Sequence, residues 1–137
     1  MSKSLTVEGD IAAADTRTLL TSQGSVTAPS LVVPANVSKI DKLVVAIATD
    51  EAADHSTTYI LRLNGGAVKD GEQVIVIGAS GFIDIETGAN TAGAIVRPLV
   101  LDDVDIAISP SDTITIAVDQ ASGDNGTAHA VITLLFE

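Results

Sequence analysis

The chain has 137 residues, of which 46% are hydrophobic and 2% aromatic, and its formal net charge is −11. This composition fits one globular domain and excludes intrinsic disorder, while the absence of cysteine excludes a disulfide scaffold, a thiolate metal site and a thiol enzyme. The negative charge argues against nucleic-acid binding, which depends on Lys and Arg to neutralise phosphates, so we expect no nucleic-acid partner.

The N-terminal third begins with an irregular segment. Residues 1–30 are rich in Ser, Thr, Ala and Gly, and we expect them to form an N-terminal arm or an edge strand, with residues 31–137 forming the domain. Glu8 and Asp10 interrupt the apolar stretch that a signal peptide would need. The longest strongly apolar run, 43–48, is far shorter than the roughly 20 residues that span a bilayer. We therefore expect no signal peptide and no membrane insertion.

Several segments are almost continuously apolar. Residues 42–48, 73–77 and 129–136 consist mainly of Val, Ile, Leu and Ala, which predicts strands that are covered on both faces. Residues 59–63 predict a further strand that pairs with the segment before or after it. The β-branched residues that dominate these runs pack well on a pleated sheet.

Other segments alternate between apolar and polar residues, which is the period of a half-buried strand. The alternation occurs in residues 82–86, 104–109 and 112–119. In the last of these, Ile114 and Ile116 share one face with Val118. These segments predict antiparallel strands with one wet face.

Turn residues separate the predicted strands at short intervals. Examples are Asn64-Gly65-Gly66, Asp70-Gly71 and the segments 78–81 and 109–112, and residues 122–126 resemble the loop of a final hairpin. Neither 10–15 nor 49–54 is long enough for an independent helix. The pattern predicts an all-β protein, either an antiparallel sandwich or a barrel.

The two histidines offer little for catalysis or metal binding. His55 follows Asp54, but adjacent residues on a strand point to opposite faces, which suits neither a catalytic triad nor a shared metal. We interpret His55 as part of a polar loop and His129 as a strand residue near a sheet edge. Since no nucleophile elbow or phosphate-binding loop occurs either, we expect no catalytic residues and no enzyme activity.

Two acidic clusters are the candidates for a calcium site. Alternation would place Asp103 and Asp105 on one face, close enough to share an ion. Asp119 and Asp124 flank the last loop, although their spacing is not that of an EF-hand. A solvated acidic surface explains both clusters as well, so we predict no cofactor beyond this calcium alternative.

The order of strands and turns resembles the single jelly-roll coat proteins of icosahedral viruses, including archaeal and bacterial ones. The resemblance lies in residues 31–40 leading into a long buried strand, in 111–116, and in the closing strand 130–136. It implies an antiparallel β-sandwich, a jelly roll of about eight strands in two four-stranded sheets, with loops at one end and sheet edges facing neighbours. Coat proteins of this kind carry no catalytic residues.

These observations predict a structural subunit that assembles with copies of itself and with other coat proteins. A viral capsid, vertex or decoration protein is the expected role, in a virion or another extracellular assembly. One alternative is a subunit of an extracellular filament, in which residues 1–30 insert as a strand into the next subunit. A second is a calcium-dependent small-ligand or glycan-binding module, although the chain has only Tyr59, Phe82 and Phe136 as aromatic residues. A cupin-type enzyme fits poorly without clustered histidines.

Overall fold

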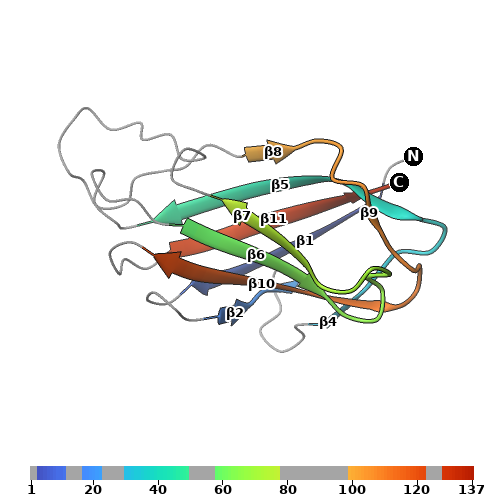
Figure 1. Ribbon diagram of the computed structural model, residues 1–137, viewed down its shortest axis with the longest axis horizontal. Coiled ribbons are helices and arrows are strands. Elements are labelled where there is room, and N and C mark those ends of the chain that lie inside the picture. Colours follow the sequence, from blue (N-terminus) through green and yellow to red (C-terminus); the bar gives the residue numbers. More distant parts are fainter. Residues whose placement is uncertain (1–2, 12–16, 23–29, 50–57, 78–98, 123–127) are drawn as a thin grey trace.

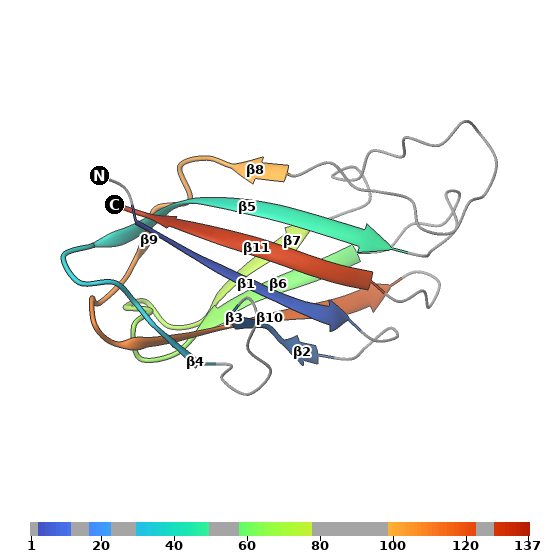
Figure 2. The same cartoon turned by 180° about the vertical axis from the view of Figure 1, so that it is seen from behind.

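The computed structural model describes residues 3–11, 17–22, 30–49, 58–77, 99–122 and 128–137, and within these ranges every regular element is a β-strand. The strands form two layers that pack face to face (Figures 1 and 2). Their bounds are β1 Lys3–Ile11, β2 Arg17–Leu19, β3 Thr21–Ser22, β4 Ser30–Val32, β5 Lys39–Thr49, β6 Thr58–Asn64, β7 Gln73–Ile77, β8 Leu99–Leu101, β9 Ile106–Ala107, β10 Thr113–Ser122 and β11 Ala128–Phe136.

Each layer is one antiparallel sheet. Sheet A has six strands in the order β3-β1-β11-β5-β8, with β9 also paired to β5. Sheet B has five strands in the order β2-β10-β6-β7, with β4 also paired to β10. Both termini lie at the same end of the sandwich, because Lys3 of β1 pairs with Phe136 of β11.

The pairing scheme is that of a long antiparallel hairpin rolled up into two sheets. Its pairs are β1 with β11, β2 and β4 with β10, β5 with β8, and β6 with β7. Rolling adds the pairs β11 with β5 and β10 with β6, which complete sheets A and B. This order is a jelly roll, so the predicted fold class is confirmed.

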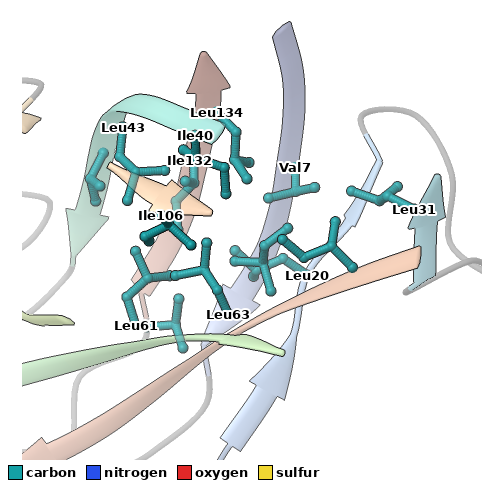
Figure 3. Packing of buried hydrophobic residues seen from close by; sticks show 14 of the residues in the cluster. Val7, Leu20, Leu31, Ile40, Leu43, Leu61, Leu63, Ile106, Ile132 and Leu134 are labelled. Atoms are coloured by element: carbon teal, nitrogen blue, oxygen red, sulfur yellow. The ribbon is translucent and has the colours of Figure 1, made fainter. Parts of the chain in front are cut away.

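The core lies between the two sheets and is almost entirely aliphatic. Figure 3 shows Val7, Ile132 and Leu134 of sheet A directed toward Leu61 and Leu63 of sheet B. These side chains are 2% exposed or less. Because β-branched and leucine side chains fill this space without polar atoms, the core has few groups that need buried hydrogen bonds.

The alternating pattern in the sequence correctly predicts which residues of β10 face inward. Ile114, Ile116 and Val118 are buried, while Thr113 and Thr115 lie on the outer side. One tight turn also follows its expected chemistry. Gly65 has a φ of +117°, and a Cβ atom there would lie 2.6 Å from the carbonyl oxygen of Thr113, so only glycine fits this position.

Residues 122–126 do not close a hairpin between neighbouring strands. β10 belongs to sheet B and β11 to sheet A, and β11 pairs instead with β1 and β5. The chain therefore crosses from one sheet to the other between these strands. Local turn residues do not distinguish a hairpin from a crossing between sheets, because both need a tight reversal of direction.

The strand predicted over residues 104–109 is also much shorter than expected. β9 covers only Ile106–Ala107, and Asp103 and Asp105 have positive φ angles of 54° and 51°. Two left-handed residues bend the backbone out of the extended conformation. The strand predicted at 82–86 lies outside the described residues.

The N-terminal segment contributes to both sheets of its own chain. β1 pairs with β11 along its full length, from Lys3 to Ile11. Farther along, β2 pairs with β10 in sheet B and β3 pairs with β1 in sheet A. Segment 17–22 therefore joins the two sheets along one side of the sandwich.

Candidate functional site: the outer face of sheet B

Exposed large apolar side chains gather on one surface. Five large hydrophobic side chains are exposed among the described residues. One of them, Val100 of β8, lies in sheet A and is 53% exposed. The other four lie on strands of sheet B: Leu19, Val32, Val74 and Val76. We call the outward side of β2, β4, β10, β6 and β7 the outer face of sheet B.

The strand register brings these side chains into rows. Leu19 pairs with Ala117, which pairs with Arg62, which in turn pairs with Val74. In the next row Ile60 lies between Asp119 and Val76. Paired residues on neighbouring strands point to the same side of a sheet, so both rows lie on the outer face.

Ala117 shows how closely these rows pack. It points outward, yet only 5% of its surface is exposed, because the longer side chains of Leu19 and Arg62 stand on either side of it. Ala117 is thus covered by its neighbours on β2 and β6 and contributes little exposed surface of its own.

The charged side chains in the middle of the face are bonded to one another. The Nε atom of Arg62 donates a hydrogen bond to Asp119 at 2.8 Å, and its Nη1 atom donates one to Glu72 at 3.2 Å. The hydrogen bond that Arg62 donates to Asp119 is the main reason that the pKa of Arg62 is raised above its ordinary value. The guanidinium therefore stays charged at every physiological pH and holds both acids in place.

The residues proposed for a calcium site are used in other ways. Asp105 accepts a hydrogen bond from the Nζ atom of Lys39 at 3.0 Å, and Asp102 lies 3.4 Å from Lys42. Asp103 and Asp105 do not lie on a common strand face, since both belong to the bent loop before β9. The calcium site at these residues stays a prediction.

Only one residue of the second calcium candidate lies in the described part of the chain. Asp119 lies in β10 and bonds Arg62, whereas Asp124 lies outside the described residues. Within the described ranges, no group of three or more His, Asp or Glu side chains is arranged to hold a metal ion.

His129 is on a central strand of sheet A, which corrects the expectation that it lies near a sheet edge. β11 has β1 on one side and β5 on the other. The His129 Nδ1 atom is 2.7 Å from Asp10, and the Nε2 atom is 3.7 Å from Glu8. Both acids stand on β1, so the register of β1 with β11 brings this group together on the outer side of sheet A. His55, with Asp54, lies outside the described residues.

An open cavity of about 350 Å³ lies at the end of the sandwich that holds both termini. Lys3, Asp41, Lys42 and Glu137 contribute charges of both signs to its wall. The Nζ atom of Lys3 donates a hydrogen bond to the carbonyl oxygen of Ala35, and Lys42 pairs with Asp102. Since these cations already have partners, the cavity presents little free charge to a ligand.

Two of the three aromatic residues are part of the core. Tyr59 is 0% exposed and Phe136 is 1% exposed, while Phe82 lies outside the described residues. Neither buried ring presents a surface on which a sugar could stack. Within the described ranges, no helix is long and apolar enough to cross a membrane.

The sequence did not point to the outer face of sheet B as a distinct site. Residues 73–77 and 42–48 were expected to be covered on both faces, but Val74 and Val76 are 48% and 63% exposed, and Val44 and Ala46 are half-buried. The continuous apolar segments indicated a surface that needs to be covered, but not which of its two faces. Only the position of β7 in sheet B shows that the face carrying Val74 and Val76 remains exposed to solvent.

Comparisons with known proteins give distant structural neighbours. No protein-family model matches the chain, and no curated protein matches its sequence. The chain is similar to a structure of infectious bursal disease virus, strain Gt, with a TM-score of 0.35 and 14% identity over 99% of this chain and 36% of that chain. It is also similar to a structure of the Gx strain, with a TM-score of 0.27 and 16% identity over 96% of this chain and 37% of that chain. The chain thus spans little more than a third of the length of either matched chain, and the fold assignment rests on the strand order described above.

Proposed function

We propose that this chain is a non-enzymatic structural subunit that assembles with copies of itself, as a capsid, vertex or decoration protein of a virus particle. The observation that carries the proposal is a jelly roll whose outer sheet B face gathers exposed leucine and valine side chains. Jelly rolls form viral coats but also lectin and cupin domains, so the surface, rather than the fold, favours assembly.

Burial of this face is the physical reason to assemble. Full burial of an exposed valine or leucine contributes about 1.5–3 kcal/mol, and since these four side chains are about half exposed, each can contribute roughly half of that. Two of the four, Val74 and Val76, stand two residues apart on the same strand, β7, and so form an apolar pair on the outer face. The formal charge of −11 keeps free subunits apart in solution, which discourages non-specific association before assembly.

Two features favour this role over the alternatives. β1 already occupies a full-length position in its own sheet, whereas a filament subunit with strand exchange needs a vacant or weakly held position. The buried rings of Tyr59 and Phe136 leave little for glycan stacking in the described residues. Calcium binding would add a function to this proposal without replacing it.

Size-exclusion chromatography with light scattering, followed by electron microscopy, tests the proposal. We expect ordered oligomers or particles whose amount grows with protein concentration. A protein that stays monomeric at high concentration, alone and with other coat components, would overturn the assembly role. Calorimetry with calcium and a glycan panel should give no heat; binding of a glycan would favour the ligand-binding module.

Deletion of residues 1–11 separates the coat and filament hypotheses. Because β1 supplies Val7 and Ile11 to the core, its loss should unfold the domain. A folded but assembly-deficient variant would instead favour strand exchange between subunits. Circular dichroism reports the fold and light scattering the assembly.

A further inference from the structure

The edges of the two sheets differ in how well they are protected. On one side of the sandwich, segment 17–22 serves both sheets, since β2 pairs with β10 and β3 with β1. On the other side, β8 is three residues long. β7 has five residues, which makes it the longest edge strand in the part of the chain that the structure describes, and there it pairs only with β6.

β7 also lacks the features that normally prevent an edge strand from pairing. Natural edges are blunted by lysine, proline, a β-bulge or an inward-pointing charge. β7 reads Gln-Val-Ile-Val-Ile and contains none of these residues, and its register with β6 is continuous from Leu63↔Gln73 to Tyr59↔Ile77. Among the described residues no strand pairs with its outer edge, so the backbone groups there can accept another extended strand.

The sequence of β7 is self-complementary around its middle residue. In an antiparallel pair with a two-fold axis at Ile75, Val74 lies opposite Val76 of the second copy, and the reverse pair forms on the other side of the axis. Both pairs stand on the outer face, because Val74 pairs with Arg62 and Val76 with Ile60. The two exposed valines of each copy thus pack side by side with those of the other.

Charge favours the same arrangement. β7 carries no charge, and the acid next to it, Glu72, bonds Arg62. Antiparallel pairing about Ile75 separates the two copies of Glu72 by six strand positions, roughly 20 Å and well beyond the ~8 Å screening length at physiological salt. Parallel pairing in register would place the same two carboxylates side by side.

From these observations we infer that β7 is the strand through which two copies of this chain pair, antiparallel and centred on Ile75, so that their B sheets form one continuous sheet. The inference rests on the proposed self-assembly and specifies one of its contacts. It joins the outer faces of two sheets B into a single apolar surface with four valines at its centre. The occupant of the edge is β7 of a second copy.

Disulfide trapping tests the register, since the chain has no cysteine of its own. The Val74→Cys and Val76→Cys proteins are prepared separately and oxidised alone or as an equimolar mixture. Residues directly opposite on paired strands have Cβ atoms about 4.5–5.5 Å apart, whereas diagonal neighbours are about 7–8 Å apart, too far for a disulfide. We expect the mixture to give a disulfide-linked dimer that contains one copy of the Val74→Cys protein and one copy of the Val76→Cys protein. Either variant oxidised alone should give little dimer. Equal cross-linking by one variant alone would overturn the register.

A charge variant tests whether the edge contributes to the affinity. Val76→Lys places a cation against a valine of the second copy, and we expect it to raise the dissociation constant of the dimer by roughly tenfold or more. Val100→Lys is the matched control, because Val100 is 53% exposed against 63% for Val76 and lies on β8 of sheet A, away from the outer face of sheet B. Circular dichroism confirms that both variants remain folded. An unchanged dissociation constant for Val76→Lys would overturn the inference.

The same measurements separate this inference from the proposed function. If the unmodified protein assembles but the cysteine mixture gives no covalent dimer, the pairing of β7 is wrong while self-assembly stands. If the unmodified protein is monomeric at every concentration, both are overturned.

Discussion

The backbone amide of Leu20 donates a hydrogen bond to the carbonyl oxygen of Ile116 at 2.8 Å, at the point where the chain passes from sheet B to sheet A. Leu19, just before it, pairs with β10, and Thr21, just after it, pairs with β1. The Leu20 side chain enters the core between the sheets and is fully buried. This contact closes one side of the sandwich.

Replacement of Leu20 by alanine should therefore be strongly destabilising. We expect the free energy of unfolding to fall by about 2–5 kcal/mol, because the variant loses apolar burial and leaves a cavity where the sheets meet. Leu19→Ala is the matched control, since the Leu19 side chain is 50% exposed, and it should change stability by roughly 0.5 kcal/mol or less. Urea denaturation measures both. Equal effects would mean that the side chain of Leu20 does not hold the sheets together.

A charge on the inner face of β10 should abolish folding. Ile116 is 0% exposed and faces the core, so Ile116→Asp would bury a carboxylate without a partner. The Thr115→Asp variant places the same group on the outer side of the same strand and should remain folded. Circular dichroism and thermal unfolding distinguish the two. A stable Ile116→Asp protein would mean that the faces of β10 are assigned wrongly.

The turn after β6 should not tolerate a side chain at its first glycine. Gly65→Ala would force an L-residue to adopt a φ of +117° and press its Cβ atom against the Thr113 carbonyl. A strained backbone of this kind costs about 1–3 kcal/mol, and the steric contact adds to it. Gly71→Ala is a useful comparison, because Gly71 also has a positive φ of 81° but nothing lies within 4 Å of the added atom. The difference between the two unfolding free energies isolates the steric part, and we expect Gly65→Ala to be the less stable variant.

Stability should decline at high pH through Lys39. The hydrogen bond with Asp105 is the main cause that raises the pKa of Lys39 above its ordinary value of 10.5, and Glu137 and Asp41 add to it. The folded state therefore holds this proton more tightly than the unfolded state does. The resulting stabilisation is complete below the unfolded pKa and is lost as the pH rises through the higher folded pKa.

The test is urea denaturation between about pH 9 and pH 12. Lys39→Met should lose less stability over this range than the unmodified protein, because it has no proton to release. Asp105→Asn should flatten the curve in the same direction, since it removes the main partner. A steeper decline in Lys39→Met would contradict the assigned sign.

Much of the fold could be predicted from local patterns. The alternation of Ile114, Ile116 and Val118 correctly predicts the buried face of β10, and the Asn64-Gly65-Gly66 turn follows from the need for a positive φ. The prediction of a hairpin around residues 122–126 is wrong, because β10 and β11 belong to different sheets. Residues near a turn do not encode whether the next strand joins the same sheet, because that depends on partners far away in the sequence.

The candidate site, too, could be predicted only in part from the sequence. The continuous apolar run at 73–77 marks a surface that needs covering, and the lack of cysteine and of catalytic motifs narrows the kind of function. Neither shows that Val74 and Val76 remain open at an edge, or that Arg62 joins Asp119 and Glu72 beside them. Those facts depend on long-range register between β10, β6 and β7.

By itself, the sequence determined an aliphatic, acidic, all-β chain, because period-two alternation, β-branched residues and turn glycines act over a few neighbouring residues. Only the tertiary structure decided the jelly-roll order, the closure of one side through Leu20 and the open edge at β7. The physical reason is that a strand has two faces and two edges. Local sequence sets how apolar each face is, but the arrangement of distant strands decides which face and which edge are covered.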